Sequence, residues 1–156
     1  NFQIRKATPK DAQTIFDLIY KLAVYEKLEN DVITSVEELR TNIFEKRFAE
    51  VLIAEEDEKP VGFALYFHNF STFVGKPGIY LEDLFVEPET RGKGYGKALL
   101  VELARIAKER NCGRLEWSVL DWNTPSIEFY KSLGAKPMDE WTVFRLDKTG
   151  IENLAK

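Results

Sequence analysis

Three glycines, Gly92, Gly94 and Gly96, stand within five residues between a predicted strand and a predicted helix. Glycine lets the backbone approach a ligand closely, and the free N–H groups and the dipole at a helix N-terminus attract phosphate. The stretch RGKGYGK adds an arginine and two lysines. The pattern predicts a pyrophosphate cradle, while a tight strand-to-helix turn without a ligand fits the glycines equally well.

Two familiar phosphate motifs do not fit this stretch. A Walker P-loop requires glycine where Arg91 stands and Ser or Thr where Ala98 stands. A dinucleotide fingerprint requires its third glycine at position 97, which is lysine, although Glu116 supplies an acid about twenty residues on. Both motifs are therefore disfavoured.

Two adjacent acids, Glu82 and Asp83, interrupt the apolar stretch IYLEDLFV just before the glycines. Buried carboxylates without partners are costly, so the pair indicates either an exposed edge strand or a functional site. Neighbouring residues of a strand point to opposite faces unless a bulge intervenes.

Tyr130 in SIEFYKSLG is a further candidate. It lies three residues after Ile127, on the same predicted helix face, which is typical of a core aromatic. The residues alone therefore favour a core position for this ring.

Periodicity and capping residues predict the elements that position these side chains. Helices are predicted to begin after Thr8, after the capping box of Ser35 and Glu38, near Gly94 and at Thr124, and the first should run to about Leu28. Strands are predicted at residues 2–7, 49–54, 61–68, 78–86, 114–119 and 142–147. The order predicts a mixed α/β fold with some parallel pairing, in a single domain of residues 1–156.

Composition narrows the classes of function. No apolar run approaches the length of a membrane-spanning helix, and the first residues lack the apolar segment of a signal peptide, which predicts a cytoplasmic protein. One cysteine, Cys112, and one histidine, His68, argue against a disulfide and an ordinary zinc site. A net charge of −4 argues weakly against nucleic acid and is compatible with a cationic substrate.

Arg91, Gly94 and Gly96 match the acyl-CoA pattern in which Gln or Arg, two residues, Gly, one residue, and Gly or Ala open a helix. On this motif the chain resembles the GCN5-related N-acetyltransferases (GNAT). LEDLFV, VLDWNTPSIEFYKSLGA and KLAVYEKLENDV resemble the spermidine/spermine acetyltransferase branch of that family. VLDWN and NFSTFVGK are closest to its thialysine acetyltransferase members, although Phe73 stands where a tryptophan is expected.

The resemblance implies a GNAT fold, with a mixed central sheet of six or seven strands, a splay next to the CoA-binding turn and about four flanking helices. It implies acetyl-CoA as co-substrate, no metal and a homodimer. The implied catalytic residues are Glu82, a base that acts directly or through water, and Tyr130, whose hydroxyl protonates the departing thiolate. The residues implied to bind CoA are Leu84, Phe85, Val86, Arg91, Gly92, Lys93, Gly94, Tyr95, Gly96, Lys97, Asn123, Thr124, Pro125, Ser126 and Tyr130. Those implied to bind the amine substrate are Tyr25, Glu26, Glu82, Asp83, Glu116, Trp117, Ser118 and Glu140.

Acetyl transfer to an amine sets a protonation problem. A lysine-like ammonium, with a pKa near ~10.4, is neutral in only roughly one molecule in a few thousand at pH 7, and only the neutral amine attacks a thioester. The site therefore requires a proton acceptor and groups that stabilise the developing oxyanion.

Cys112 lies far along the chain from the cradle, so direct attack in a ternary complex is favoured over a cysteine-linked intermediate.

The leading hypothesis is thus an acetyl-CoA-dependent N-acetyltransferase for a primary amine of a small cationic substrate, such as a diamine, a polyamine, thialysine or lysine. An acetyltransferase for protein or peptide amines is one alternative. A CoA-binding regulator without turnover is another, and the presence of both Glu82 and Tyr130 speaks against it.

Overall fold

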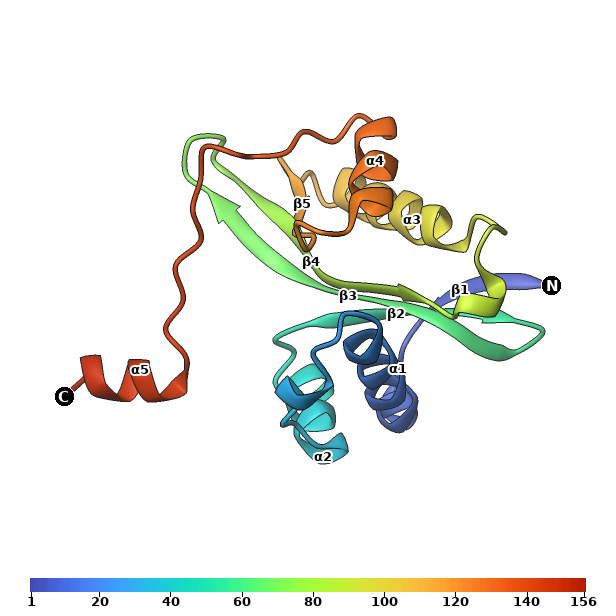
Figure 1. Ribbon diagram of the computed structural model, residues 1–156, viewed down its shortest axis with the longest axis horizontal. Coiled ribbons are helices and arrows are strands. Elements are labelled where there is room, and N and C mark those ends of the chain that lie inside the picture. The colour runs from blue at the N-terminus through green and yellow to red at the C-terminus, as the bar shows by residue number, and fades with distance from the viewer. The chain divides into compact units, whose positions relative to one another are not determined.

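The computed structural model describes residues 1–156, which form two units, 1–118 and 119–156. The first unit contains one sheet in the order β1-β2-β3-β4-β5. Its first four strands pair antiparallel, and β5 joins β4 in parallel, as Figure 1 shows. The strands are β1 Phe2–Lys6, β2 Glu50–Glu56, β3 Lys59–Ser71, β4 Lys76–Val86 and β5 Leu115–Trp117.

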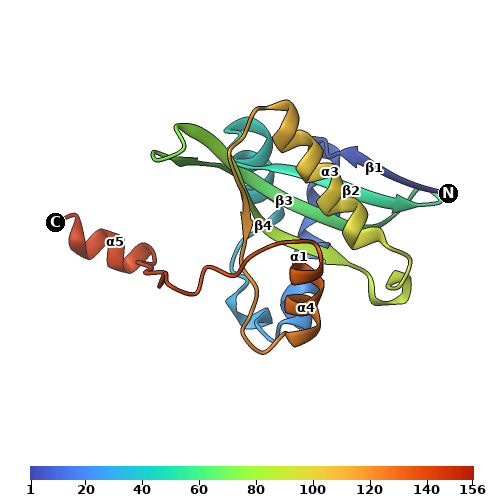
Figure 2. The ribbon, with the colours of Figure 1, turned by 90° about the horizontal axis from the view of Figure 1, so that it is seen from above.

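Three α-helices accompany this sheet. They are α1 Ala12–Tyr25, α2 Val36–Arg40, which continues as a π turn at Thr41–Glu45, and α3 Tyr95–Glu109. Helices α1 and α2 lie against one face of the sheet and α3 crosses the other (Figures 1 and 2). No helix of the structure is both long enough and apolar enough to span a bilayer.

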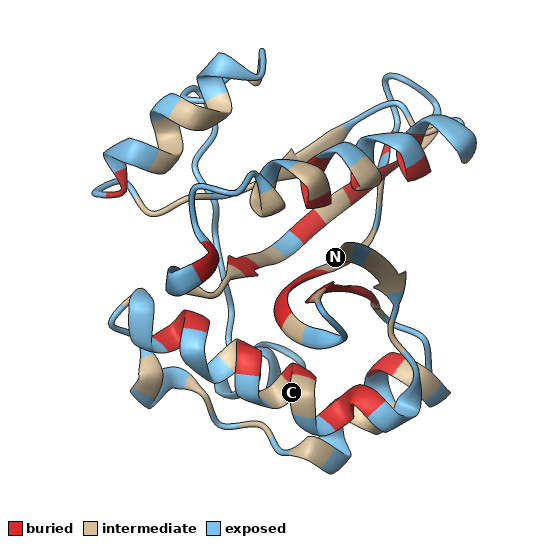
Figure 3. Cartoon of the chain, turned by 90° about the vertical axis from the view of Figure 1, so that its right-hand side faces the viewer, coloured by how far each residue is buried: buried red, intermediate tan, exposed pale blue.

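The core under α1 and α2 follows from their apolar stripes. Figure 3 shows buried residues on the sides of the helices that face the sheet. One cluster joins α1 and the π turn to three neighbouring strands through Ile15, Leu18, Leu22, Ile43, Val51, Ile53, Phe63 and Phe85. On α3 the buried side chains recur at helical spacing, at Leu99, Leu103 and Ile106, as the sequence predicts.

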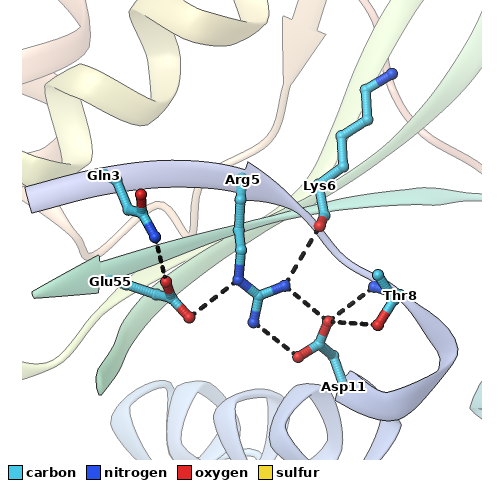
Figure 4. Close-up of polar contacts among 6 residues, drawn as sticks. All are labelled: Gln3, Arg5, Lys6, Thr8, Asp11 and Glu55. Carbon is cyan, nitrogen blue, oxygen red and sulfur yellow. Dashed lines mark hydrogen bonds and ion pairs between the residues drawn. The ribbon is translucent and has the colours of Figure 1, made fainter. Parts of the chain in front are cut away.

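The start of α1 is held by a partly buried ionic network (Figure 4). Arg5 Nη1 and Nη2 donate to the two Asp11 carboxylate oxygens at 2.9 and 2.8 Å, and Arg5 Nε donates to Glu55 Oε2 at 2.9 Å. Asp11 Oδ2 also accepts the Thr8 backbone N–H at 2.7 Å, and Gln3 donates to Glu55. The network therefore ties β1, β2 and the 3₁₀ turn Pro9–Asp11 before α1 together.

The sequence predicts the helix starts well and some of the ends less well. Ser35 Oγ accepts the Glu38 backbone N–H at 3.1 Å, as the predicted cap requires. The first helix, however, ends at Tyr25 and not near Leu28, because Lys27 adopts a left-handed conformation with φ of 63°. The Leu28 N–H then donates back to Ala23 O at 2.8 Å and closes the helix.

The expected sheet of six or seven strands is wrong, since the sheet has five strands. The predicted strand at residues 142–147 is irregular. Its apolar side chains Val143 and Phe144 are 82% and 91% exposed. A strand needs a neighbour that takes its N–H and C=O groups, and the alternation of residue types at 142–147 does not provide that neighbour.

The second unit is helical where it is regular. It contains α4 Thr124–Ser132 and α5 Lys148–Leu154, which makes five α-helices in place of the expected four. Asn123 Oδ1 accepts the Ser126 N–H at 3.3 Å and starts α4, with Pro125 in its first turn. Gly134, with φ of 92°, follows the end of α4.

The Arg5 network makes a prediction for stability against pH. Arg5 lowers the pKa of Asp11, and hydrogen bonds from Gln3 and then Arg5 lower the pKa of Glu55. Carboxyls with a lowered pKa in the folded state stabilise it above their unfolded pKa of about 4, and this stabilisation is lost as pH falls. We expect Arg5→Met to lower the free energy of unfolding by about 1–3 kcal/mol at pH 7 and by less at pH 3. Urea unfolding across this pH range measures both effects.

A matched control is the Arg105–Glu102 pair on α3, whose Arg105 side chain is 60% exposed. Arg105→Met should change the free energy of unfolding by no more than about 0.5 kcal/mol. Equal losses in the two variants would contradict a special role of Arg5.

Candidate active site

The pairing of β3 with β4 shifts its register beside the two adjacent acids. Asp83 lies opposite Leu65 and Leu81 lies opposite Tyr66, so that Glu82 is an extra residue with no partner across the strand. Such a bulge re-aims side chains that would otherwise alternate between faces. Both Glu82 and Asp83 line the same groove.

The strand pairing changes at the same point. β5 pairs with β4 only at Ile79, Tyr80 and Leu81. From Glu82 to Val86, β4 has β3 on one side and no strand on the other. β4 therefore continues beyond the end of β5, and residues 82–86 have no strand partner on the edge opposite β3.

The groove beside the bulge has a volume of about 380 Å³ and is lined by both apolar and acidic side chains. Its walls come from the last turns of α1, the segment that follows α1 and the bulge of β4. The lining residues are Ile19, Leu22, Ala23, Glu26, Leu28, Asp31, Val32, Ile33, Thr34, Glu82 and Asp83.

Two carboxyls of this groove, Asp83 and Glu26, have raised pKa values. Burial raises the pKa of Asp83 to about 7, and the negative charges of Glu82 and Glu26 add to the rise. Burial also raises the pKa of Glu26. None of these three acids forms an ion pair within the protein. A bound cation would compensate their charges, and it would lower the pKa of Asp83 in return.

The glycine loop follows the end of β4 that has no β5 partner. After the 3₁₀ turn Pro88–Thr90, Gly92 and Gly94 have φ of 88° and 82°, a conformation that favours glycine. The space beside both α-carbons is open, and Gly94 immediately precedes α3. The first N–H groups of α3 have no acceptor within the helix and no side-chain cap at Gly94, which fits the binding of a phosphate group.

Side chains of the loop have partners on neighbouring elements. Lys93 Nζ lies 2.9 Å from Glu56 Oε2, and the Tyr95 hydroxyl donates to the same carboxylate. The Tyr95 ring stacks on Phe2 with centroids 4.0 Å apart. Backbone groups of Tyr95 thus remain candidates for CoA, while its side chain braces the loop.

The other predicted residues occupy several elements. Glu116 of β5 accepts a hydrogen bond from Asn69 at 3.1 Å, and Ser118 Oγ lies 2.8 Å from the Tyr80 hydroxyl. Neither residue lines the groove, and neither does Tyr25 at the end of α1. The predicted residues in the second unit are Asn123, Thr124, Pro125, Ser126 and Tyr130 in and just before α4, and Glu140 in a turn before residues 142–147.

Some groove residues were not predicted from the sequence. Asp31 and Thr34 line it because the chain turns back after Tyr25 through the 3₁₀ turn Glu29–Asp31. The acid in YEKLEND was a visible signal for Asp31, but no local pattern indicates the direction of that turn.

Comparisons with known proteins agree with this geometry. Residues 15–135 match the Acetyltransferase (GNAT) family. The chain is 40% identical over 164 residues to a thialysine N-epsilon-acetyltransferase of Bos taurus, covering 97% of this chain and 96% of that protein. It is 34% identical over 158 residues to the enzyme of the same name from Caenorhabditis elegans, with 99% and 98% covered. A solved integron cassette protein from the mobile metagenome of V. cholerae superimposes with a TM-score of 0.83 at 31% identity, over 99% of this chain and 98% of that one.

The chain therefore belongs to the GNAT family of acetyltransferases. Family and relatives together make it an N-acetyltransferase.

The electrostatics of the groove can be tested directly. Since like charge contributes to the raised pKa of Asp83, Glu26→Gln should lower that pKa from about 7 towards the usual range. The carboxyl ¹³C shift of Asp83, followed by NMR against pH, measures the change. Glu45→Gln, at an exposed acid of the π turn, is the control and should leave the titration unaltered. An identical titration in wild type and Glu26→Gln would show that Glu26 does not act on Asp83.

Proposed function

We propose that the protein transfers an acetyl group from acetyl-CoA to a primary amine of a small cationic substrate, by direct attack in a ternary complex. The substrate class is a diamine, a polyamine, thialysine or a lysine-like amine. The observation that carries the proposal is the acidic groove, in which Glu26, Glu82 and Asp83 meet beside the end of β4 that has no β5 partner. Residues 1–156 would act as one GNAT domain.

The lining of the groove suits an aliphatic chain that bears positive charge. Apolar side chains such as Leu22 and Val32 can pack against methylene groups, and the carboxyls can accept hydrogen bonds from ammonium groups. Three relatives support this class by their names: a thialysine N-epsilon-acetyltransferase, an L-ornithine N5-acetyltransferase and a spermidine/spermine N(1)-acetyltransferase-like protein.

Two carboxyls have separate roles in the proposed mechanism. Asp83 holds the reacting ammonium, whose charge compensates an acid that is partly buried beside like charges. Glu82, the exposed residue of the bulge, accepts the proton directly or through water. Because the free Asp83 carboxyl has a pKa of about 7, it is the second candidate for the proton acceptor.

The protein groups that fit acetyl-CoA lie along the chain that follows the bulge. The backbone of Leu84, Phe85 and Val86 would bind the thioester arm, and the glycine loop Arg91–Lys97 would bind the pyrophosphate. Asn123–Ser126 would contact CoA further along, and the Tyr130 hydroxyl would hold the proton that the thiolate receives. When bound, acetyl-CoA supplies the activated acetyl group.

The remaining substrate and assembly assignments also stay proposals. Tyr25, Glu116, Trp117, Ser118 and Glu140 are candidate contacts to the amine. A cytoplasmic homodimer stays a prediction, for which the exposed apolar side chains of Trp141, Val143 and Phe144 offer interface material.

A substrate panel tests the function. With acetyl-CoA and detection of released thiol, we expect turnover of 1,4-diaminobutane, spermidine, thialysine or lysine. A preferred diamine should exceed n-butylamine, its matched control with one amine, by about tenfold or more in kcat/KM, because a second ammonium gains a charge-assisted hydrogen bond. Short peptides that outcompete every small amine would favour a protein acetyltransferase. CoA binding without acetylation of any amine would indicate a regulator.

The pH dependence of turnover tests the role of Glu82. A general base must be ionised, so kcat/KM of the wild type should fall as pH drops below the pKa of that base. We expect Glu82→Gln to lower kcat by about 100-fold and to remove this acidic limb, a typical loss for a general base. Glu45→Gln should keep the wild-type profile. If the limb persists in Glu82→Gln and vanishes in Asp83→Asn, Asp83 is the base.

A further inference from the structure

Two contacts of similar spacing join α1 to the loop that follows β4. Lys21 Nζ lies 2.5 Å from Glu87 Oε2, and the guanidinium carbon of Arg91 lies 4.7 Å from the centroid of the Tyr25 ring. Lys21 and Tyr25 are four residues apart, and thus one turn apart on α1. Glu87 and Arg91 are four residues apart and flank the 3₁₀ turn Pro88–Thr90. The helix and the loop are therefore held at two points.

The turn between Glu87 and Arg91 is internally fixed. The backbone N–H and the hydroxyl of Thr90 both donate to Glu87 O, at 3.0 and 2.8 Å, and Thr90 is buried. The Arg91 N–H donates to Pro88 O at 3.2 Å, and Arg91 Nε donates to Val86 O at 3.3 Å. The turn thus fixes the separation between Glu87 and Arg91. The ion pair between Glu87 and Lys21 therefore helps to hold Arg91 over the Tyr25 ring.

The stack of Arg91 on Tyr25 lies between the two regions of the proposed function. Arg91 opens the glycine loop that would bind the CoA pyrophosphate. Tyr25 ends α1 immediately before Glu26, which lines the acidic groove. The contact is therefore a direct connection between the anion-binding loop and the amine groove.

A guanidinium can serve both regions at once. Its flat face stacks on an aromatic ring, while its N–H groups point outward in the plane and donate to phosphate. Arg91 can hence bind an anion in the glycine loop without leaving Tyr25. An anion on Arg91 would restrict the guanidinium, and the restricted guanidinium would in turn restrict the Tyr25 ring and the helix end that carries Glu26.

We propose that Arg91 and Tyr25 couple the two substrates, so that CoA bound at the glycine loop raises the affinity of the groove for the amine. This inference rests on the proposed function. It replaces the candidate contact of Tyr25 with the amine by an indirect role: Tyr25, which does not line the groove, is a positioning residue that acts through Arg91. Coupling of binding is reciprocal, so the amine must raise the affinity for CoA by the same factor. A cation–π contact at a partly exposed site corresponds to a factor of about two to five.

Calorimetric titration of CoA, which forms a complex without turnover, measures this factor as the ratio of Kd values without and with saturating spermidine. In the wild type we expect a ratio of about two to five. Tyr25→Leu, which removes the ring, should bring the ratio to about one, whereas Tyr25→Phe, which keeps the ring, should retain the wild-type ratio. Arg91→Lys keeps the charge but loses the planar face, and its ratio should also fall towards one.

The outcomes separate this inference from the function on which it rests. A ratio of one in the wild type, or a wild-type ratio in Tyr25→Leu, overturns the coupling and leaves the proposed function standing, because that function requires only that each substrate binds. Failure of CoA or of every amine in the panel to bind the wild type overturns both.

Lys21→Met, one turn away, should lower the ratio only in part if the ion pair supports the stack. Unchanged thermal melting in each variant assigns its ratio to the contact and not to loss of fold.

Discussion

The register shift in β4 is the constraint on which the rest of the candidate site depends. From Ile79 to Leu81 the strand has a neighbour on each side. At Glu82 one extra residue enters, and β5 pairs no further. This single irregularity has two effects. It lets two consecutive carboxyls line one groove, and it leaves the following backbone open on one edge. A regular strand would send Glu82 and Asp83 to opposite faces, so the groove would lose one of its charges.

Acidic side chains in the first unit have two opposite environments. Hydrogen bonds from Arg5 keep the pKa of Asp11 low, and hydrogen bonds from Gln3 and Arg5 keep the pKa of Glu55 low, so these acids stabilise the fold when ionised. Asp83 has burial and like charges around it, and its pKa rises to about 7. Its raised pKa costs stability as pH rises through that value, because the unfolded chain holds the ionised form at lower cost. No ion pair within the protein compensates the cost of ionising Asp83, whereas a bound ammonium would. This is the physical basis for assigning the groove to an amine.

The helix starts were predicted correctly because each depends on interactions between residues that are adjacent in the chain. The serine cap of α2, the asparagine and proline at the start of α4 and the glycines before α3 each depend on a few adjacent residues. The prediction of a last strand at residues 142–147 was wrong for the opposite reason. The stretch from Thr142 to Asp147 has strand-like composition, but strand formation requires hydrogen bonds to a partner that the stretch itself does not contain. The end of α1 at Tyr25 was likewise decided by Lys27, whose left-handed conformation is unusual for lysine.

By itself, the sequence determined the glycine loop, the two adjacent acids, the order of most elements and a resemblance to the acetyltransferase family, all of which are properties of residue type and spacing along the chain. It allowed a bulge at Glu82 without requiring one. Only the tertiary structure decided that Glu26 and Asp31 join the β4 acids in one groove, that burial raises the pKa of Asp83 to about 7, and that the Arg91 guanidinium lies over the Tyr25 ring. These features, like the ion pair between Lys21 and Glu87, which are 66 positions apart, join residues that are distant in the chain. They depend on burial and orientation, which a linear pattern does not contain.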